Sequence, residues 1–213
     1  MKVGILGSGV VGQVLGSGFI GHGHDVMVGT RSPEKLAEWK AQTADAGRIG
    51  TFAQTAAFGE MLVLAVQGAA AGKALDMAGD NLRGKIVIDA TNPLDEAPPE
   101  NGVLKFFTSL DESLMERLQA AHPEARLVKA FNSVGNALMV NPDFGGIKPT
   151  MFICGDDADA KREVSRVLDQ FGFEAEDMGG VQAARAIEPL CMLWCIPGFL
   201  RNEWTHAFKL LKG

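Results

Sequence analysis

A glycine-rich turn near the start of the chain has the residue types and the spacing of a phosphate-binding loop. In such a loop the first glycine permits a tight turn, the second lets the backbone approach a pyrophosphate, and the third lets the following helix pack on the strand. It follows an apolar strand pattern over residues 2–6 and comprises Gly7, Ser8, Gly9, Val10, Val11 and Gly12. This placement predicts a dinucleotide site. The alternative interpretation is a glycine-rich turn that binds no ligand.

The residues after the second predicted strand favour NADP over NAD. Proteins that bind NAD usually carry an acidic residue there, but Asp25 lies at the start of this strand, on the wrong edge to reach a ribose. The strand is followed instead by Thr30, Arg31, Ser32 and Lys35. A planar guanidinium, two hydroxyls and the start of the next helix suit a 2′-phosphate. In the alternative interpretation Ser32 only caps that helix, and Arg31 and Lys35 form a solvated face.

Three further strand ends are expected to line the same cleft. Small apolar residues there allow a ribose or nicotinamide to lie against the backbone, and an amide can offer hydrogen bonds. The candidates are Ala65 and Val66 after the fourth strand, Asn92 and Pro93 after the fifth, and Phe131 and Asn132 after the sixth. An Asn before Pro is also an ordinary turn former, and Phe131 is equally interpreted as a core residue.

No side chain is predicted to act as a catalytic acid, a catalytic base or a metal ligand. The chain has no tyrosine, which excludes carbonyl protonation through a Tyr–Lys pair. Neither an HExxH nor a CxxC spacing occurs among His22, His24, His122, His206, Cys154, Cys191 and Cys195. The cysteines are expected to be buried free thiols in a reducing compartment.

Length and composition predict one domain with an appendage that binds a small organic ligand. The chain has 213 residues, 46% of them hydrophobic, and a net charge of −6, which argues against nucleic acid as a partner. No targeting segment precedes the first strand, so we expect a cytoplasmic protein. The longest uncharged apolar run, Leu190 to Leu200, contains Pro197 and is shorter than a membrane helix requires.

The elements that must position these residues form an α/β pattern. Short apolar runs alternate with helical periodicity, which predicts a Rossmann doubly wound, mostly parallel sheet. We expect strands at 2–6, 25–29, 49–51, 61–66, 85–90, 126–130, 150–154 and 173–177, helices at 10–21 and 32–46, and a long loop at 92–109. Residues 1–177 are expected to form the NADP-binding domain. Residues 178–213 are expected to form a C-terminal helical segment that packs on the cleft or on a second subunit of a homodimer.

Several segments in this order resemble the NADP oxidoreductases that depend on coenzyme F420, a deazaflavin, and the related NADP domain of the six-transmembrane metalloreductases. The resemblance covers nearly the whole chain. It rests on residues 7–12, on Thr30-Arg31-Ser32 with Lys35, on 89–94, 129–132 and 154–157, and on 184–185, 188–190 and 193–194. It implies that Ser8, Gly9, Val10 and Val11 hold the pyrophosphate and that Thr30, Arg31 and Lys35 hold the 2′-phosphate.

The resemblance also implies direct hydride transfer between NADP(H) and a bound deazaflavin or flavin, with no protein acid or base. Two departures leave coenzyme F420, FMN and FAD open as the second substrate. The glycine loop is one residue shorter than in the archaeal enzymes, and Phe131-Asn132 stands where those have a His-containing segment. A small imine or ketone reductase similar to pyrroline-5-carboxylate reductase and a non-catalytic NADP(H)-sensing module are the alternative functions.

Overall fold

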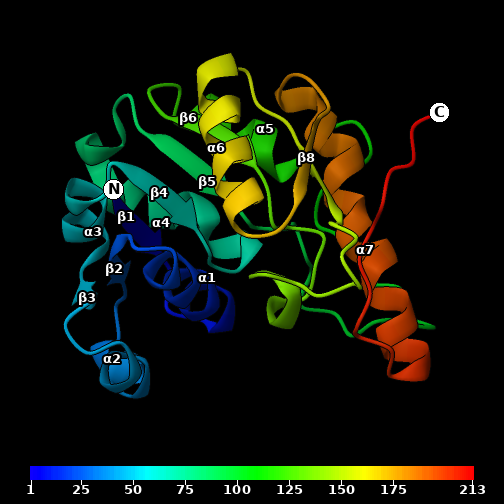
Figure 1. Cartoon of the computed structure of the whole chain (residues 1–213). Helices are drawn as coiled ribbons and strands as arrows, with labels where there is room; N and C mark the ends of the chain where they lie inside the picture. Colours follow the sequence, from blue (N-terminus) through cyan, green and yellow to red (C-terminus); the bar gives the residue numbers. More distant parts are fainter.

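A six-stranded parallel sheet forms the centre of the computed structural model, which describes all residues 1–213 (Figure 1). Its strand order is β3-β2-β1-β4-β5-β6. From β1 in the centre, β2 and β3 extend the sheet to one edge, and β4, β5 and β6 extend it to the other. The strands are β1 (Lys2–Leu6), β2 (Asp25–Gly29), β3 (Gly47–Gly50), β4 (Met61–Leu64), β5 (Ile86–Asp89) and β6 (Arg126–Lys129). This is the doubly wound order of the Rossmann fold, so the predicted fold class is confirmed.

Helices cover both faces of the sheet. On one face lie α1 (Val10–Gly21), the short turn η1 (Pro33–Leu36), α2 (Ala37–Thr43) and α6 (Ala158–Gln170). On the other lie α3 (Phe52–Phe58), α4 (Ala71–Ala78), α5 (Leu114–Ala121) and α7 (Ala184–Arg201). Single-turn 3-10 helices complete the connections at η2 (Gly68–Ala70), η3 (Gly79–Leu82), η4 (Asn136–Leu138) and η5 (Val181–Ala183).

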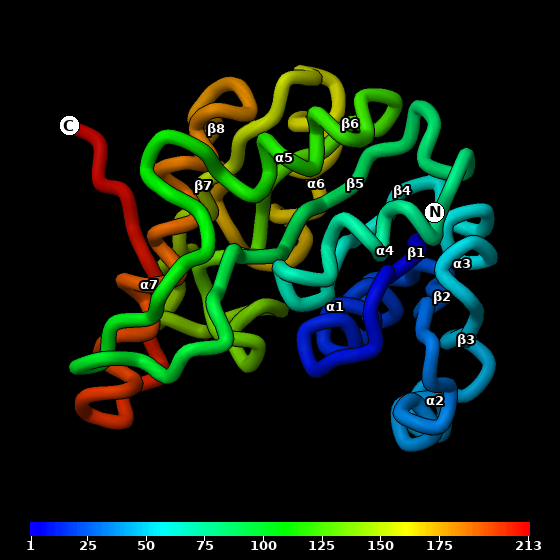
Figure 2. Tube along the Cα trace, turned by 180° about the vertical axis from the view of Figure 1, so that it is seen from behind, coloured from blue at the N-terminus to red at the C-terminus, as the bar shows by residue number.

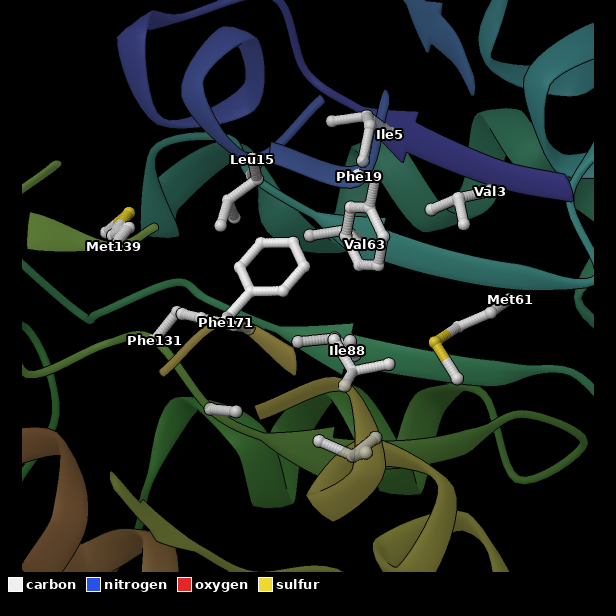
Figure 3. Close-up of a cluster of buried hydrophobic side chains, with 14 of the residues drawn as sticks. Val3, Ile5, Leu15, Phe19, Met61, Val63, Ile88, Phe131, Met139 and Phe171 are labelled. Carbon is white, nitrogen blue, oxygen red and sulfur yellow. The ribbon is translucent and has the colours of Figure 1, made fainter. Parts of the chain in front are cut away.

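Successive strand residues contribute to the two cores in turn, because side chains of a strand alternate between its faces. In β4, Met61 and Val63 belong to the core beneath α1 and α6, whereas Leu62 and Leu64 belong to the core beneath α3 and α4. In Figure 3, Val63 lies beside the ring of Phe19 from α1, and Ile88 lies near the ring of Phe171, the residue that follows α6. The central strands β4 and β5 are therefore buried on both faces, as in most parallel sheets, whereas the edge strand β3 is largely accessible.

Two further strands extend the structure beyond β6. Strands β7 (Thr150–Ile153) and β8 (Glu174–Asp177) pair in parallel, and one antiparallel bridge between Lys129 and Cys154 joins them to the central sheet. The last residues, 202–213, form an extended segment that runs beside α7 (Figures 1 and 2). The amide of Thr150 donates to the carbonyl of Phe208 at 2.8 Å, which ties this segment to β7.

The largest differences from the predicted elements lie between β2 and α3. One helix over 32–46 is predicted, but the structure has η1 followed by α2, which ends at Thr43, and the Ser32 side chain caps neither. Strand β3 ends at Gly50, one residue before the predicted end. The Thr51 side chain accepts a hydrogen bond from the amide of Gln54 and caps α3, so Thr51 starts a helix rather than ending a strand.

Helix α7 is longer than the sequence pattern indicates. Pro189 and Pro197 lie inside it, and together with η5 it spans the 21 residues Val181–Arg201. The most apolar 18-residue window of this span has a mean hydropathy of 1.3. By length and composition alone this helix would be able to cross a membrane, so the expectation that no segment is long enough was wrong. Glu188 lies within it, buried and paired with a lysine, as in a helix that packs on a protein core.

Candidate functional site

The glycine loop joins the carboxyl end of β1 to the start of α1. Gly7 has a φ of +132°, and a Cβ atom there would lie 2.2 Å from the carbonyl oxygen of Ala65. A Cβ atom on Gly12 would lie 2.2 Å from the carbonyl oxygen of Gly7. No atom lies within 4 Å of the Cβ position of Gly9. The first and third glycines are therefore required by packing, while the second leaves open space above the backbone.

The start of α1 offers backbone donors to this open space. The first N–H groups of a helix have no intrahelical acceptor, and along α1 the first such bond runs from the amide of Gln13 to the carbonyl of Gly9. No acidic residue lies in the first turn, and no side chain caps it. The unpaired amides and the helix dipole therefore favour an anion at this position.

The ends of β1, β2 and β4 surround a cavity of about 370 Å³. Nine of the predicted site residues line it, namely Gly7, Ser8, Gly9, Thr30, Arg31, Ser32, Lys35, Ala65 and Val66. Gln67, which directly follows Val66, also lines it, and Phe52 and Ala70 complete the lining without having been indicated by the sequence. Because the chain brings these residues together from three separate loops, the cavity has the size and the edge-of-sheet position of a nucleotide site.

The cavity is cationic at the β2 side. Arg31 and Lys35 are exposed, and neither takes part in an ion pair of the molecule. Thr30 is buried, and its hydroxyl lies 2.8 Å from the hydroxyl of Ser8 and accepts a hydrogen bond from the amide of Ser32. Two unpaired cations beside a hydroxyl pair fit a phosphate group.

A smaller cavity of about 50 Å³ lies next to the first, between Phe52 and α4. Arg31 and Val66 line both cavities, and Lys73 adds a third cation that the sequence analysis did not identify. A flat apolar ligand group in this cavity would have Phe52 and Arg31 among its neighbours. The signal for Lys73 is weak in the sequence, since one lysine on a short helix is usually a solvated residue.

A wider groove of about 500 Å³ runs along the outer side of α1. Trp39, Val140 and Asn141 line it, and His22 is its single titratable residue. The groove follows the body of the helix rather than the carboxyl ends of the strands, where ligands of doubly wound sheets bind. Volume alone therefore does not make it the candidate site.

Asn92 and Asn132 join the loops after β5 and β6. The side-chain amide of Asn92 donates to the carbonyl of Asn132 at 2.8 Å, and that of Asn132 donates to the Asn92 side-chain oxygen at 3.1 Å and to the carbonyl of Ile187 at 3.0 Å. The Oδ1 atom of Asn132 is buried and has no donor. Asn92 is therefore a link between loops rather than a free amide, and Pro93 beside it is buried.

Phe131 belongs to the core and not to the cleft. Its side chain is fully buried, and its ring meets the rings of Phe171 and Phe173 at centroid distances of 5.6 and 6.0 Å (Figure 3). Its φ of +62° is unusual for a large side chain and turns the chain sharply after β6. Of the two interpretations of this residue, the core one holds, and its ring is not available to a ligand.

A buried ionic network behind the cleft was missed as a functional feature. The ammonium of Lys129 lies 2.7 Å from Asp89 Oδ2, 3.0 Å from Glu188 Oε1 and 2.9 Å from the carbonyl oxygen of Thr91. Burial would lower the pKa of Lys129, but the charges of Asp89 and Glu188 outweigh burial and raise it. The available signal is a charged residue at the end of each of two apolar strands and another within the apolar α7 pattern.

The remaining titratable side chains gather at no second site. No group of three His, Cys, Asp or Glu side chains is arranged to hold a metal ion. All three cysteines are free, and burial raises the pKa of the Cys154 thiol to about 12. His122 is buried between Asp76 and Glu124, a pairing that the sequence did not indicate.

Comparisons with known proteins agree with this geometry. The family model described as NADP oxidoreductase, coenzyme F420-dependent, matches residues 2–93. A crystal structure of a candidate F420-dependent NADP reductase from Arthrobacter sp. FB24 is 32% identical, with a TM-score of 0.91, and each chain is covered to 100%.

Two curated relatives extend the comparison. The F420-dependent NADP reductase of Methanothermobacter marburgensis is 28% identical over 224 residues, which are 99% of both chains. Rat metalloreductase STEAP3 is 32% identical over 204 residues, 93% of this chain. The chain spans 39% of the length of that metalloreductase.

Proposed function

The chain belongs to the NADP oxidoreductases that depend on coenzyme F420, and on this basis we propose that it transfers hydride between NADP(H) and a deazaflavin of the coenzyme F420 type. An NADP-dependent oxidoreductase is the activity common to the relatives that match over their whole length. The single observation that carries the proposal is the cavity of about 370 Å³, which joins the α1 amino terminus to the unpaired cations after β2.

The two ends of this cavity suit the two phosphate-bearing parts of NADP(H). The backbone of Ser8, Gly9, Val10 and Val11, with Gly7 and Gly12 shaping the turn, is proposed to hold the pyrophosphate, because the α1 amides are unpaired and the space above Gly9 is open. The 2′-phosphate is assigned to Thr30, Arg31, Ser32 and Lys35. Charge-assisted hydrogen bonds from Arg31 and Lys35 would then discriminate NADP(H) from NAD(H).

The nicotinamide end is assigned to the ends of β4, β5 and β6. Ala65 and Val66 offer a small apolar surface, and the linked pair Asn92 and Asn132, with Pro93 beneath it, forms the next wall. The buried Oδ1 of Asn132 has no donor in the protein, which supports a hydrogen-bonding ligand group at this end.

No protein acid or base is assigned to the reaction. The buried cation behind this end, Lys129, donates to the Thr91 carbonyl and is paired with the carboxylates of Asp89 and Glu188, so it is held within the protein. The nicotinamide supplies the hydride when it is bound, and the protein orients the reactants and excludes water. This division suits an acceptor that takes a hydride directly.

The acceptor is proposed to be a deazaflavin because the full-length relative from Methanothermobacter marburgensis is named for coenzyme F420. FMN and FAD are the alternative acceptors. The metalloreductase similarity covers only part of those longer proteins, so it does not outweigh the full-length match.

The test is NADPH oxidation by the purified full chain, followed by the loss of reduced-nicotinamide absorbance. Coenzyme F420, FMN, FAD, riboflavin and a cyclic imine are added in turn, with NADH as the matched control donor. We expect turnover with coenzyme F420 and NADPH and much slower turnover with NADH. Turnover with a flavin or the imine alone would replace the deazaflavin assignment, and NADPH binding without turnover would favour an NADP(H)-sensing module.

We further propose that the protein is a homodimer in the cytoplasm. Large apolar side chains are exposed near the end of α7 and on the loop that precedes α5, including Leu110, Leu193, Phe199 and Leu200. The loop and the end of α7 meet where the Cβ position of Gly102 lies 2.9 Å from the Leu200 side chain, and exposed apolar surface is typical of an interface. Sedimentation equilibrium of the wild type should give a dimer, and Leu200→Glu should weaken it more than Met178→Glu, a change of an exposed methionine after β8.

A further inference from the structure

The ammonium of Lys129 links four parts of the chain at the carboxyl edge of the sheet. Lys129 ends β6, its partner Asp89 ends β5, and the two residues are paired in register. Its other partners are Glu188 on α7 and the carbonyl of Thr91 in the loop after β5. The side chains of Lys129 and Asp89 are fully inaccessible, and that of Glu188 is 2% exposed, so solvent does not screen these contacts.

Glu188 extends this network to a further helix. Its two carboxylate oxygens accept hydrogen bonds from the amides of Leu114 and Met115, at 3.0 Å each, in the first turn of α5. The network holds two carboxylates and one ammonium, so it carries one excess negative charge. The α5 amino terminus offsets that charge, because its amides and its dipole both favour an anion.

The same contacts reach the proposed nicotinamide end of the cleft. The amide and the hydroxyl of Thr91 donate to Asp89 Oδ1 at 2.9 and 2.6 Å, and Asn92 follows directly in the chain. Asn132 bonds both Asn92 and the carbonyl of Ile187, the residue before Glu188. The backbone of Asn92 also packs tightly on Gly68, where a Cβ atom would lie 2.0 Å from the Asn92 carbonyl oxygen.

We propose that Lys129 and Glu188 are positioning residues, which fix α7 against the ends of β5 and β6 and thereby set the Asn92–Asn132 wall at the nicotinamide end. This inference rests on the proposed function. Neither side chain contacts a reactant, because both are buried and both are paired with groups of the protein itself. The adenosine end of the cavity is built from β1 and β2 and does not depend on them.

The test compares the two ends of the cleft in two variants. Glu188→Gln removes the excess negative charge and leaves Lys129 paired with Asp89, so it makes the network neutral. Lys129→Met removes the central cation. Binding of 2′,5′-ADP reports on the adenosine end alone. The fluorescence of bound NADPH and the rate of coenzyme F420 reduction report on the nicotinamide end.

We expect both variants to bind 2′,5′-ADP within about twofold of the wild type, as distant sites usually behave independently. The rate at saturating NADPH should fall by roughly 10- to 100-fold, because small displacements of reacting groups are costly in rate. The emission of bound NADPH should move toward that of free NADPH, a change that requires no acceptor.

Lys85→Met is the matched control. Lys85 directly precedes β5, at the amino-terminal edge of the sheet, opposite the edge where Asp89 and Lys129 lie. Its ammonium donates to the carbonyls of Ala56 and Gly59. Loss of this lysine should lower the melting temperature without changing either the NADPH emission or the rate of the folded enzyme.

The outcomes separate this inference from the function on which it rests. A wild type that binds neither 2′,5′-ADP nor NADPH contradicts the proposed function. A wild type that turns over, with variants that keep its rate and its NADPH emission, overturns the positioning role. Equal losses of 2′,5′-ADP and NADPH binding also overturn it, since they would show a general disturbance of the fold. If Lys129→Met does not fold, Glu188→Gln decides the question alone.

Discussion

Replacement of Gly9 by valine should abolish NADP(H) binding while leaving the protein folded. The backbone of Gly9 is extended, with φ −73° and ψ 178°, a conformation that any residue adopts. No protein atom lies within 4 Å of the position that a Cβ atom would take. The side chain would therefore enter only the space that we assign to the pyrophosphate.

The expected magnitudes differ between stability and binding. A glycine at the start of a helix is a better cap than valine by about 1 kcal/mol, which lowers the melting temperature of a chain of this size by about 2–4 °C. Loss of two hydrogen bonds to a charged pyrophosphate, at about 1.5–3 kcal/mol each, weakens binding by more than roughly 100-fold. The binding effect should thus far exceed the folding effect.

Two variants of α1 serve as controls for this experiment. Gly21→Val places the same side chain in open space at the other end of the helix and should change neither property. Gly12→Val forces a Cβ atom against the Gly7 carbonyl, at 2.2 Å, and should destabilise the fold by about 1–3 kcal/mol or more. Thermal unfolding and titration with NADPH measure the two effects. Wild-type affinity in folded Gly9→Val would refute the pyrophosphate assignment, and a melting temperature as low as that of Gly12→Val would refute the open-space argument.

Three other changes test separate parts of the structure. Arg31→Ala should weaken NADPH binding by about 1.5–3 kcal/mol and NADH binding little; an equal loss for both nucleotides would remove the 2′-phosphate assignment. Lys129→Met should lower the free energy of unfolding by about 3–5 kcal/mol, because two buried carboxylates lose their cation. A decrease of less than about 1 kcal/mol in denaturant unfolding would contradict this. A hydrogen bond from Arg185 lowers the pKa of Glu116 from 4.5 to about 2, so its stabilisation is complete above pH 4.5 and is lost as the pH falls toward 2. The melting-temperature difference between the wild type and Arg185→Ala should therefore shrink across that pH range, and a constant difference would show that the pair does not titrate.

Local sequence patterns were sufficient for the sheet and for the cavity residues at the ends of β1 and β2. β1, α1 and β2 have the predicted boundaries, because the glycine loop, the apolar alternation and the Gly21–Gly23 break are signals within a few residues of one another. The cavity residues after β1 and β2 follow from the same rule, since the carboxyl ends of parallel strands lie at one edge. The predicted boundaries between β2 and α3 were wrong in part because Thr51, expected to end a strand, caps α3 instead.

The loops after β5 and β6, where we propose the nicotinamide end, were harder to predict because they depend on contacts between distant segments. Nothing near Phe131 in the sequence distinguishes a ring in the core from a ring at the cleft; its burial is set by Phe171 and Phe173, which follow much later. Asn92 has the local pattern of a turn former, yet its amide is used by Asn132. Contacts between residues this far apart in the sequence become visible only in the tertiary structure.

The ionic network explains how the apolar helix α7 is fixed in one position against the sheet. An apolar helix would pack on the sheet in several registers, since hydrophobic contacts are non-directional. Glu188 removes that freedom, because an unpaired buried carboxylate is costly and its partners, Lys129 and the first amides of α5, exist at one position only. Whether the network fixes the position of α7 is best tested by replacing all its charged side chains with apolar ones, rather than by removing a single partner. If α7 is held in register by this carboxylate, an apolar network of similar volume should keep the protein stable while the nicotinamide end loses its fixed geometry.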